Sequence, residues 1–276
     1  MNRQICQRPR NLLVLSVLFL SGCGKEADTN MTVSTIAPVS EQGLQNVAKK
    51  KIFFGHQSVG YDIIQGVGDV LKQNSAAGMK IVESADPGVF TAPLLAHARV
   101  GRNSDPESKI REFSERVRAG IGERADVVTF KFCYADFEKT TNSAQVFEAY
   151  RAAMAELSKA YPNTRFVHIT VPLKATSRGW KTHIKNLLGR PHPFIADNVR
   201  RDEFNEMMRK EYTGRQPLFD LAAVEATRAD GGVSFDKSGG KAVPSLVNEY
   251  TYDSGHLNER GRKYVAERFL ALLASL

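Results

Sequence analysis

The sequence is short of the residues and motifs that several protein classes need. It has 3 cysteines in 276 residues, and no spacing of cysteine, histidine and carboxylate residues is typical of a metal site. No phosphate-binding loop or dinucleotide fingerprint is present. The sequence therefore indicates neither a metalloprotein nor a nucleotide-dependent enzyme, and no cofactor is expected.

Charge and hydrophobicity exclude further classes. The formal net charge of +8 includes three arginines of the N-terminal segment, and the remaining charge of about +5 is too mild and scattered to indicate a nucleic-acid-binding protein. With 42% hydrophobic and 25% charged residues, the composition is that of a globular protein, neither disordered nor built of many membrane spans.

The N-terminus predicts export and lipid anchoring. Three arginines precede an apolar run over residues 12–20, which is typical of a signal peptide. The next residues, Leu20-Ser21-Gly22-Cys23, resemble a bacterial lipobox, in which the cysteine thiol is acylated. We therefore predict a signal peptide over residues 1–22 and a membrane anchor at Cys23. Gly24 favours the outer membrane, facing the periplasm, by resemblance to Gram-negative lipoproteins.

The rest of the chain predicts one domain behind a tether. Residues 23–43 are polar and lack apolar periodicity, which indicates a flexible tether, and the folded domain is expected over residues 44–276. In this interpretation cleavage removes Cys6 and lipidation uses Cys23, so only Cys133 remains and an intrachain disulfide is excluded. We expect Cys133 to be a buried structural thiol.

Short apolar runs alternate with segments of helical period along this domain. The runs predicted as strands are 51–54, 80–83, 126–132, 165–171 and 217–221. Helices are predicted from Asp105, around Phe147 to Tyr161, and from about Asn258 to the end. This alternation predicts an α/β fold: a three-layer α/β/α sandwich with a mainly parallel sheet of about five strands. Active sites in such sheets lie at the carboxyl ends of the strands.

Two segments offer candidate catalytic residues. Ser58 follows the first predicted strand in Gly55-His56-Gln57-Ser58, at a strand-to-helix turn, where it is either a nucleophile or an ordinary helix N-cap. Asp253 and His256 stand three residues apart before the last helix. They form either a surface turn or the acid–base pair that a catalytic serine requires.

Together these segments resemble the SGNH (GDSL-type) hydrolase family. Its last motif stands almost intact here as Asp253-Ser254-Gly255-His256-Leu257-Asn258, whereas its first has His-Gln before Ser58 in place of a single Asp. The resemblance implies a flavodoxin-like fold, ester hydrolysis, and a triad of Ser58, His256 and Asp253.

The same resemblance implies an oxyanion hole made by a glycine N–H and an asparagine side chain. Gly101 matches the glycine, but Ala135 stands where the asparagine is expected and has no side-chain donor. Asn103 is the nearest substitute by sequence, and Lys131 is another candidate. Removal of one oxyanion donor typically lowers the rate about 10²- to 10³-fold, so this position bears directly on activity.

Three functions are consistent with these residues. The first is an esterase acting on a small or glycan ester, and the second is an O-acyltransferase using the same triad. The third is a catalytically silent glycan-binding lipoprotein, which Ala135 favours. A basic insertion over 174–197 with Trp180, His183 and His192 is either a sugar-binding border of the site or a solvated loop. The oligomeric state is not predicted.

Overall fold

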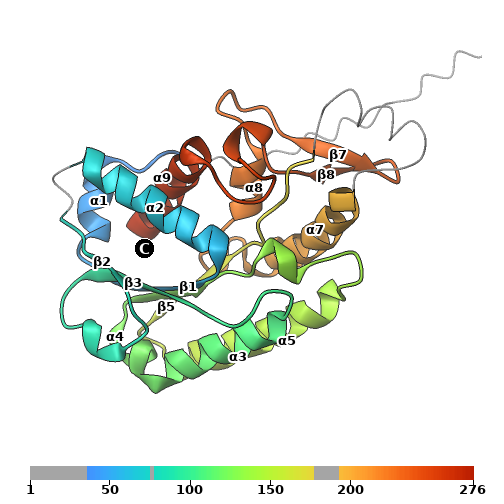
Figure 1. Ribbon diagram of the computed structural model, residues 1–276. Coiled ribbons are helices and arrows are strands. Elements are labelled where there is room, and N and C mark those ends of the chain that lie inside the picture. Colours follow the sequence, from blue (N-terminus) through green and yellow to red (C-terminus); the bar gives the residue numbers. More distant parts are fainter. Residues whose placement is uncertain (1–35, 75–77, 177–192) are drawn as a thin grey trace, which may run out of the picture. The chain divides into compact units, whose positions relative to one another are not determined.

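The computed structural model describes residues 36–74, 78–176 and 193–276. Most of these residues form one six-stranded sheet in the order β2-β3-β1-β4-β5-β6, in which every neighbouring pair is parallel (Figure 1). The strands are β1 (Lys51–His56), β2 (Ile81–Glu83), β3 (Leu94–Arg99), β4 (Val127–Phe130), β5 (Arg165–Ile169) and β6 (Leu218–Phe219). The predicted α/β class with a parallel sheet is confirmed.

The structure has one strand more than expected in this sheet, because β3 was not predicted. β3 is Leu-Leu-Ala-His-Ala-Arg, with two alanines and no β-branched residue, and alanine is a poor strand former. Burial compensates for the weak propensity, since β3 lies between β1 and β2 and its first five residues are buried. The position of β3 between two other strands, and not the strand propensity of its residues, therefore accounts for this strand.

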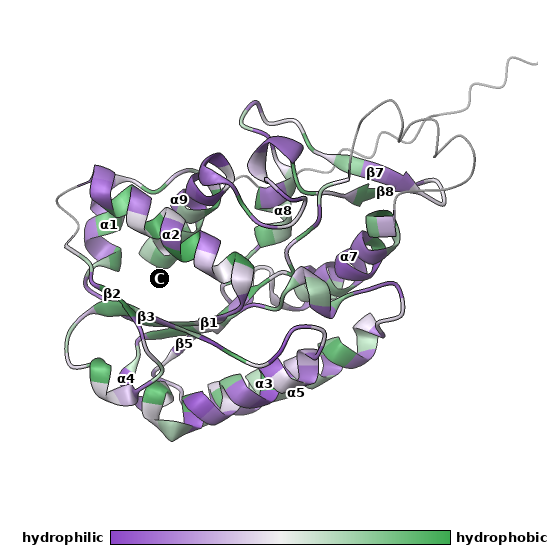
Figure 2. Ribbon diagram, viewed as in Figure 1, coloured by the Kyte–Doolittle hydropathy of each residue, from purple (hydrophilic) through white to green (hydrophobic). Residues whose placement is uncertain are grey.

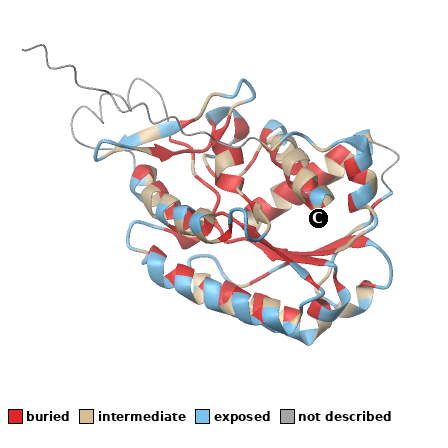
Figure 3. Cartoon of the chain, turned by 180° about the vertical axis from the view of Figure 1, so that it is seen from behind, coloured by how far each residue is buried: buried red, intermediate tan, exposed pale blue. Residues whose placement is uncertain are grey.

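Helices cover both faces of the sheet and bury it. One face carries α1 (Glu41–Val47), α2 (Ser58–Gln73), α8 (Leu221–Ala226) and α9 (Glu259–Ser275); the other carries α3 (Pro106–Arg116), α4 (Gly122–Arg124), α5 (Ser143–Ala160) and α7 (Pro193–Tyr212). A β-hairpin of β7 (Phe235–Ser238) and β8 (Lys241–Pro244) stands apart from the sheet. Figure 3 shows the strands buried and the outer helix faces exposed, and Figure 2 shows the corresponding alternation of polar and apolar residues along the helices.

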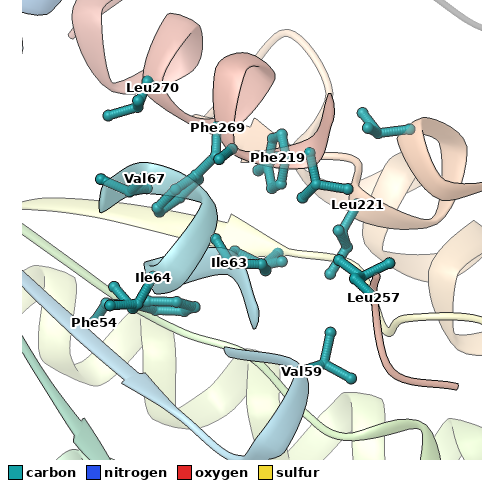
Figure 4. Packing of buried hydrophobic residues seen from close by; sticks show 14 of the residues in the cluster. Phe54, Val59, Ile63, Ile64, Val67, Phe219, Leu221, Leu257, Phe269 and Leu270 are labelled. Carbon is teal, nitrogen blue, oxygen red and sulfur yellow. The ribbon is translucent and has the colours of Figure 1, made fainter. Parts of the chain in front are cut away.

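The core forms two clusters of buried apolar side chains, one on each face of the sheet. The cluster under α2 and α9 includes Phe54, Val67, Phe269 and Leu257 (Figure 4). The other lies under α3, α5 and α7. His168 of β5 belongs to this second layer as a buried residue that hydrogen-bonds Tyr150, as its position in a predicted strand suggested. Cys133 is also buried, as expected.

The fold begins before the predicted domain boundary. α1 starts at Glu41 with Ser40 as its N-cap, three residues before the expected start at residue 44. Val39 donates its N–H to the carbonyl of Glu267 in α9, and Ile36 packs against the core. The part of the predicted tether after residue 35 is therefore folded. No helix of the described ranges has the length and apolar character to cross a membrane.

α2 and α9 pack closely at Gly66, which provides a stability test. A Cβ at Gly66 would lie 2.3 Å from the carbonyl oxygen of Arg262, whereas a Cβ at Gly68, two residues further along α2, would meet nothing within 4 Å. We expect Gly66→Ala to destabilise the fold by about 1–3 kcal/mol through overpacking. Gly68→Ala, its matched control, should stabilise the fold by about 0.5–1 kcal/mol. Urea unfolding measures both, and an equal effect of the two substitutions would contradict this packing.

Candidate active site

The candidate nucleophile lies at the start of α2, directly after β1. Gln57 is the N-cap and Ser58 is the first helical residue, so Ser58 does not cap the helix. Within residues 36–74, 78–176 and 193–276, nothing hydrogen-bonds to the Ser58 hydroxyl. The side chain is half-buried at the carboxyl end of a central strand, where parallel sheets place their active sites.

The helix end also offers free hydrogen-bond donors. The first N–H groups of a helix have no partner within it, and in the described chain the N–H groups of Ser58 and Val59 have no other acceptor. The N–H of Gly60 is bonded to the carbonyl of Gln57. A negatively charged oxygen next to Ser58 would therefore meet unpaired donors and the positive end of α2.

The candidate acid–base pair is preformed. Nδ1 of His256 lies 2.5 Å from Oδ2 of Asp253, and the N–H groups of Gly255 and His256 donate to Oδ1. Burial alone would raise the pKa of Asp253, but the hydrogen bonds from His256 and Gly255 lower it below its usual range. The carboxylate is thus ionised and accepts the Nδ1 proton, which leaves Nε2 with the lone pair that a general base needs.

The loop that carries this pair is bonded to α2, one turn after Ser58. Asp62, four residues after Ser58 and therefore on the same side of the helix, accepts the N–H of Leu257 at 3.0 Å. The side chains of Leu257 and Val59 belong to the same buried cluster (Figure 4). Ser254, in a left-handed conformation with φ 74°, accepts the N–H of Ala175. These contacts bring the loop of Asp253 and His256 to the end of the sheet where Ser58 lies.

Nε2 of His256 faces a residue that the sequence did not single out. The hydroxyl of Tyr134 lies 3.4 Å from Nε2, and the two rings meet edge to face with centroids 5.8 Å apart. The imidazole also stacks on Tyr252, which is 69% exposed. No hydrogen bond joins His256 to Ser58 in the described chain, although catalytic hydrogen bonds are often long before substrate binds.

The structure does not support the predicted role of Gly101. Its N–H donates to Oε2 of Glu112 at 2.6 Å, and its carbonyl accepts from the side chain of Gln57 at 2.7 Å. Although burial favours neutral Glu112, hydrogen bonds from Arg116 and Gly101 keep its pKa below the usual range, so the acceptor is charged. The Gly101 N–H is therefore occupied and not free for an oxyanion.

One of the two polar atoms of the Asn103 side chain is hydrogen-bonded. Its Oδ1 accepts from Nζ of Lys109 at 3.1 Å, and its side chain is exposed. Its carboxamide NH₂ has no acceptor in the described chain, so it remains a candidate donor. Lys131 is different: it is fully buried, burial lowers its pKa, and Nζ donates to the carbonyl of Phe132. We assign Lys131 no role at the surface of the site.

A buried ion pair joins the two loops that border the site. Nζ of Lys109 in α3 lies 2.5 Å from Oδ2 of Asp136, and both side chains are fully buried. Asp136 also accepts the N–H groups of Cys133 and Ser104. The loop after β3 and the loop after β4, which carries Tyr134 and Ala135, are thereby held to each other.

The predicted lipobox with Cys23, and Trp180, His183 and His192, lie outside the described residues.

Comparisons with known proteins give structural likeness only. No protein-family profile matches the chain, and no curated protein is similar in sequence. Among solved structures, the chain is similar to a protein assigned as a platelet activating factor from Streptococcus pneumonia, with 14% identity, 84% of this chain and 90% of that one covered, and a TM-score of 0.48.

Two further structures are similar to a comparable degree. One is a protein assigned to the G-D-S-L family of lipolytic proteins from Desulfitobacterium hafniense, with 10% identity, coverage of 81% and 99%, and a TM-score of 0.46. The other is the periplasmic domain of a lipopolysaccharide acetyltransferase from Salmonella ser. Paratyphi A, with 14% identity, coverage of 81% and 83%, and a TM-score of 0.44.

Proposed function

We propose that the chain is a serine esterase of the SGNH type, with Ser58 as nucleophile, His256 as general base and Asp253 as the residue that orients His256. The observation that carries the proposal is the hydrogen-bonded Asp253–His256 pair, bonded through Leu257 to Asp62, one turn after Ser58 in α2. An unpaired serine hydroxyl, free helix N–H groups and an oriented imidazole are the parts that nucleophilic catalysis on an ester requires.

The reaction follows from these parts. Oγ of Ser58 attacks the ester carbonyl carbon, and its proton passes to Nε2 of His256 while the carbonyl electrons move onto oxygen. The N–H of Ser58 stabilises that oxyanion. His256 then gives the proton to the departing alkoxide as the carbon–oxygen bond breaks. Water attacks the acyl-enzyme in the same way, releasing the acid and restoring Ser58.

The substrate proposed is a small-molecule or glycan ester. A sugar hydroxyl that replaces water in the second half-reaction would make the protein an O-acyltransferase by the same steps. The occupied Gly101 N–H and the lack of a side-chain donor at Ala135 favour the third possibility, a silent glycan-binding protein, because they leave few donors for an oxyanion.

Labelling with a fluorophosphonate separates enzyme from silent protein. The reagent phosphonylates an activated serine irrespective of the natural ester, so the detergent-solubilised full chain is treated with it and the modified residue is located by mass spectrometry. We expect stoichiometric modification of Ser58. An unmodified Ser58 in folded protein would overturn the proposal, and product analysis with an added sugar acceptor then distinguishes transfer from hydrolysis in an active enzyme.

We further propose that the protein is exported and anchored by acylation of Cys23, in the outer membrane facing the periplasm. Multiple acyl chains bind a membrane stably, since each buried methylene contributes about 0.8 kcal/mol. We expect Cys23→Ser to prevent acylation and to leave unprocessed precursor, as seen by radiolabelled palmitate incorporation and intact mass. Mature protein of unchanged mass in the membrane fraction of the Cys23→Ser strain would refute the anchor.

A further inference from the structure

The proposed esterase lacks a donor that its chemistry needs. The N–H of Gly101 is donated to Glu112, and Ala135 has no donor in its side chain. Beyond the helix N–H groups at Ser58, the oxyanion needs a fixed donor within about 3 Å if the rate is to be normal. A replacement should lie beside His256 Nε2, because the reacting carbonyl binds next to the serine whose proton Nε2 receives.

We propose that the hydroxyl of Tyr134 is this donor, which makes Tyr134 a catalytic residue of the proposed esterase. In the free protein its hydroxyl is the partner of Nε2 of His256 at 3.4 Å, a long hydrogen bond, and rotation about its C–O bond turns the proton to a substrate oxygen without movement of the ring. Tyr134 directly precedes Ala135 in the loop after β4, so it enters the site from the loop that should have supplied the missing asparagine. The inference rests on the proposed function.

The tyrosine ring is held firmly, as a preorganised donor should be. Its backbone carbonyl accepts from Nε of Arg201 at 3.0 Å, and its ring edge meets His256. On the side of Gly255 the fit is tight, since a Cβ there would lie 2.9 Å from the ring. The buried Lys109–Asp136 pair fixes the turn behind it. Little reorganisation is needed when charge develops on the substrate.

The surroundings of Tyr134 keep its hydroxyl protonated, so that it can donate a hydrogen bond. Burial raises the pKa of Tyr134 well above its usual range, and the nearby carboxylate of Asp253 adds to this effect. The hydroxyl therefore keeps its proton at neutral pH and acts as a donor, not as a base. Nζ of Lys174 lies 5.0 Å from the ring centroid, so a cation–π contact adds to the packing of the ring.

Tyr134→Phe tests the proposal, because it removes the hydroxyl and keeps the ring with its contacts to His256 and Gly255. With p-nitrophenyl acetate and the full chain in detergent, we expect kcat to fall about 10²- to 10³-fold while KM changes little, as for a contact made mainly in the transition state. The thermal midpoint should stay close to that of the wild type. Tyr252→Phe is the matched control: its exposed ring also stacks on His256, and its kcat should change less than about threefold.

Two results would overturn the assignment. The first is a kcat of Tyr134→Phe within about threefold of wild type while Ser58 is still labelled by fluorophosphonate. The second is a large fall in kcat for Asn103→Ala without one for Tyr134→Phe, which would identify Asn103 as the donor. Failure of wild-type Ser58 to react with fluorophosphonate would instead refute the esterase itself, and the role of Tyr134 with it.

Discussion

Ser58→Ala and His256→Ala are each expected to remove nearly all ester turnover, with kcat lowered by about 10⁴-fold or more. Each loss should be close to the loss in the double variant, because the serine and the imidazole act on one proton and the second substitution has little left to remove. Asp253→Asn should lower kcat less than either substitution, because His256 keeps a basic nitrogen. It loses only the carboxylate acceptor 2.5 Å from Nδ1, which selects its tautomer.

Steady-state kinetics with p-nitrophenyl acetate measures these losses, after a mock purification has excluded a contaminating esterase. Ser275→Ala, at the end of α9, is a matched control and should retain full activity. Unchanged turnover in Ser58→Ala would move the nucleophile elsewhere. Additive losses for Ser58→Ala and His256→Ala would show that the two residues do not share a proton.

Asp136→Asn is expected to destabilise the fold by about 3–5 kcal/mol. The substitution leaves the Lys109 ammonium without its counter-charge. Because both side chains are fully buried, no water can replace the carboxylate at low cost. One of the Asp136 oxygens is also lost as an acceptor for the N–H groups of Cys133 and Ser104. The effect should appear in both urea and thermal unfolding.

The control for this pair is an ion pair at the surface. Arg151 and Glu148 are 2.6 Å apart in α5 with side chains 47% and 59% exposed, so Glu148→Gln should change stability by less than about 1 kcal/mol. Similar losses of unfolding free energy for Asp136→Asn and Glu148→Gln would mean that burial does not raise the cost of breaking the Lys109–Asp136 pair. Replacement of both buried partners by apolar residues should recover part of the loss.

Much of the fold was predictable because its signals are local. The strands β1, β4 and β5 are largely apolar runs, and Asp105 with Pro106 starts α3 as the capping pattern predicted. β3 was missed because its alanines carry no strand signal, so only its position between two other strands accounts for it. The hairpin of β7 and β8 was missed as well.

The site was predictable in part for the same reason. Ser58 and the Asp253–His256 loop are short motifs next to strong elements, whereas the role of Tyr134 depends on which way its ring points. The ring packs against Gly255 and Arg201, which are 121 and 67 residues away along the chain. The occupation of the Gly101 N–H likewise depends on Glu112, a helix residue that no motif connects with the loop.

The contact between α1 and α9 determines where a soluble form of the protein can begin. Ser40 caps α1, Val39 bonds to Glu267, and Gly43 lies against Ala274 near the chain's end. A recombinant form that starts at residue 44 would lose the cap and the hydrogen bond to α9, and it would expose the apolar side of the last helix. A form without the proposed anchor should therefore start at or before Ile36, so that Ser40 still caps α1 and Val39 keeps its hydrogen bond to α9.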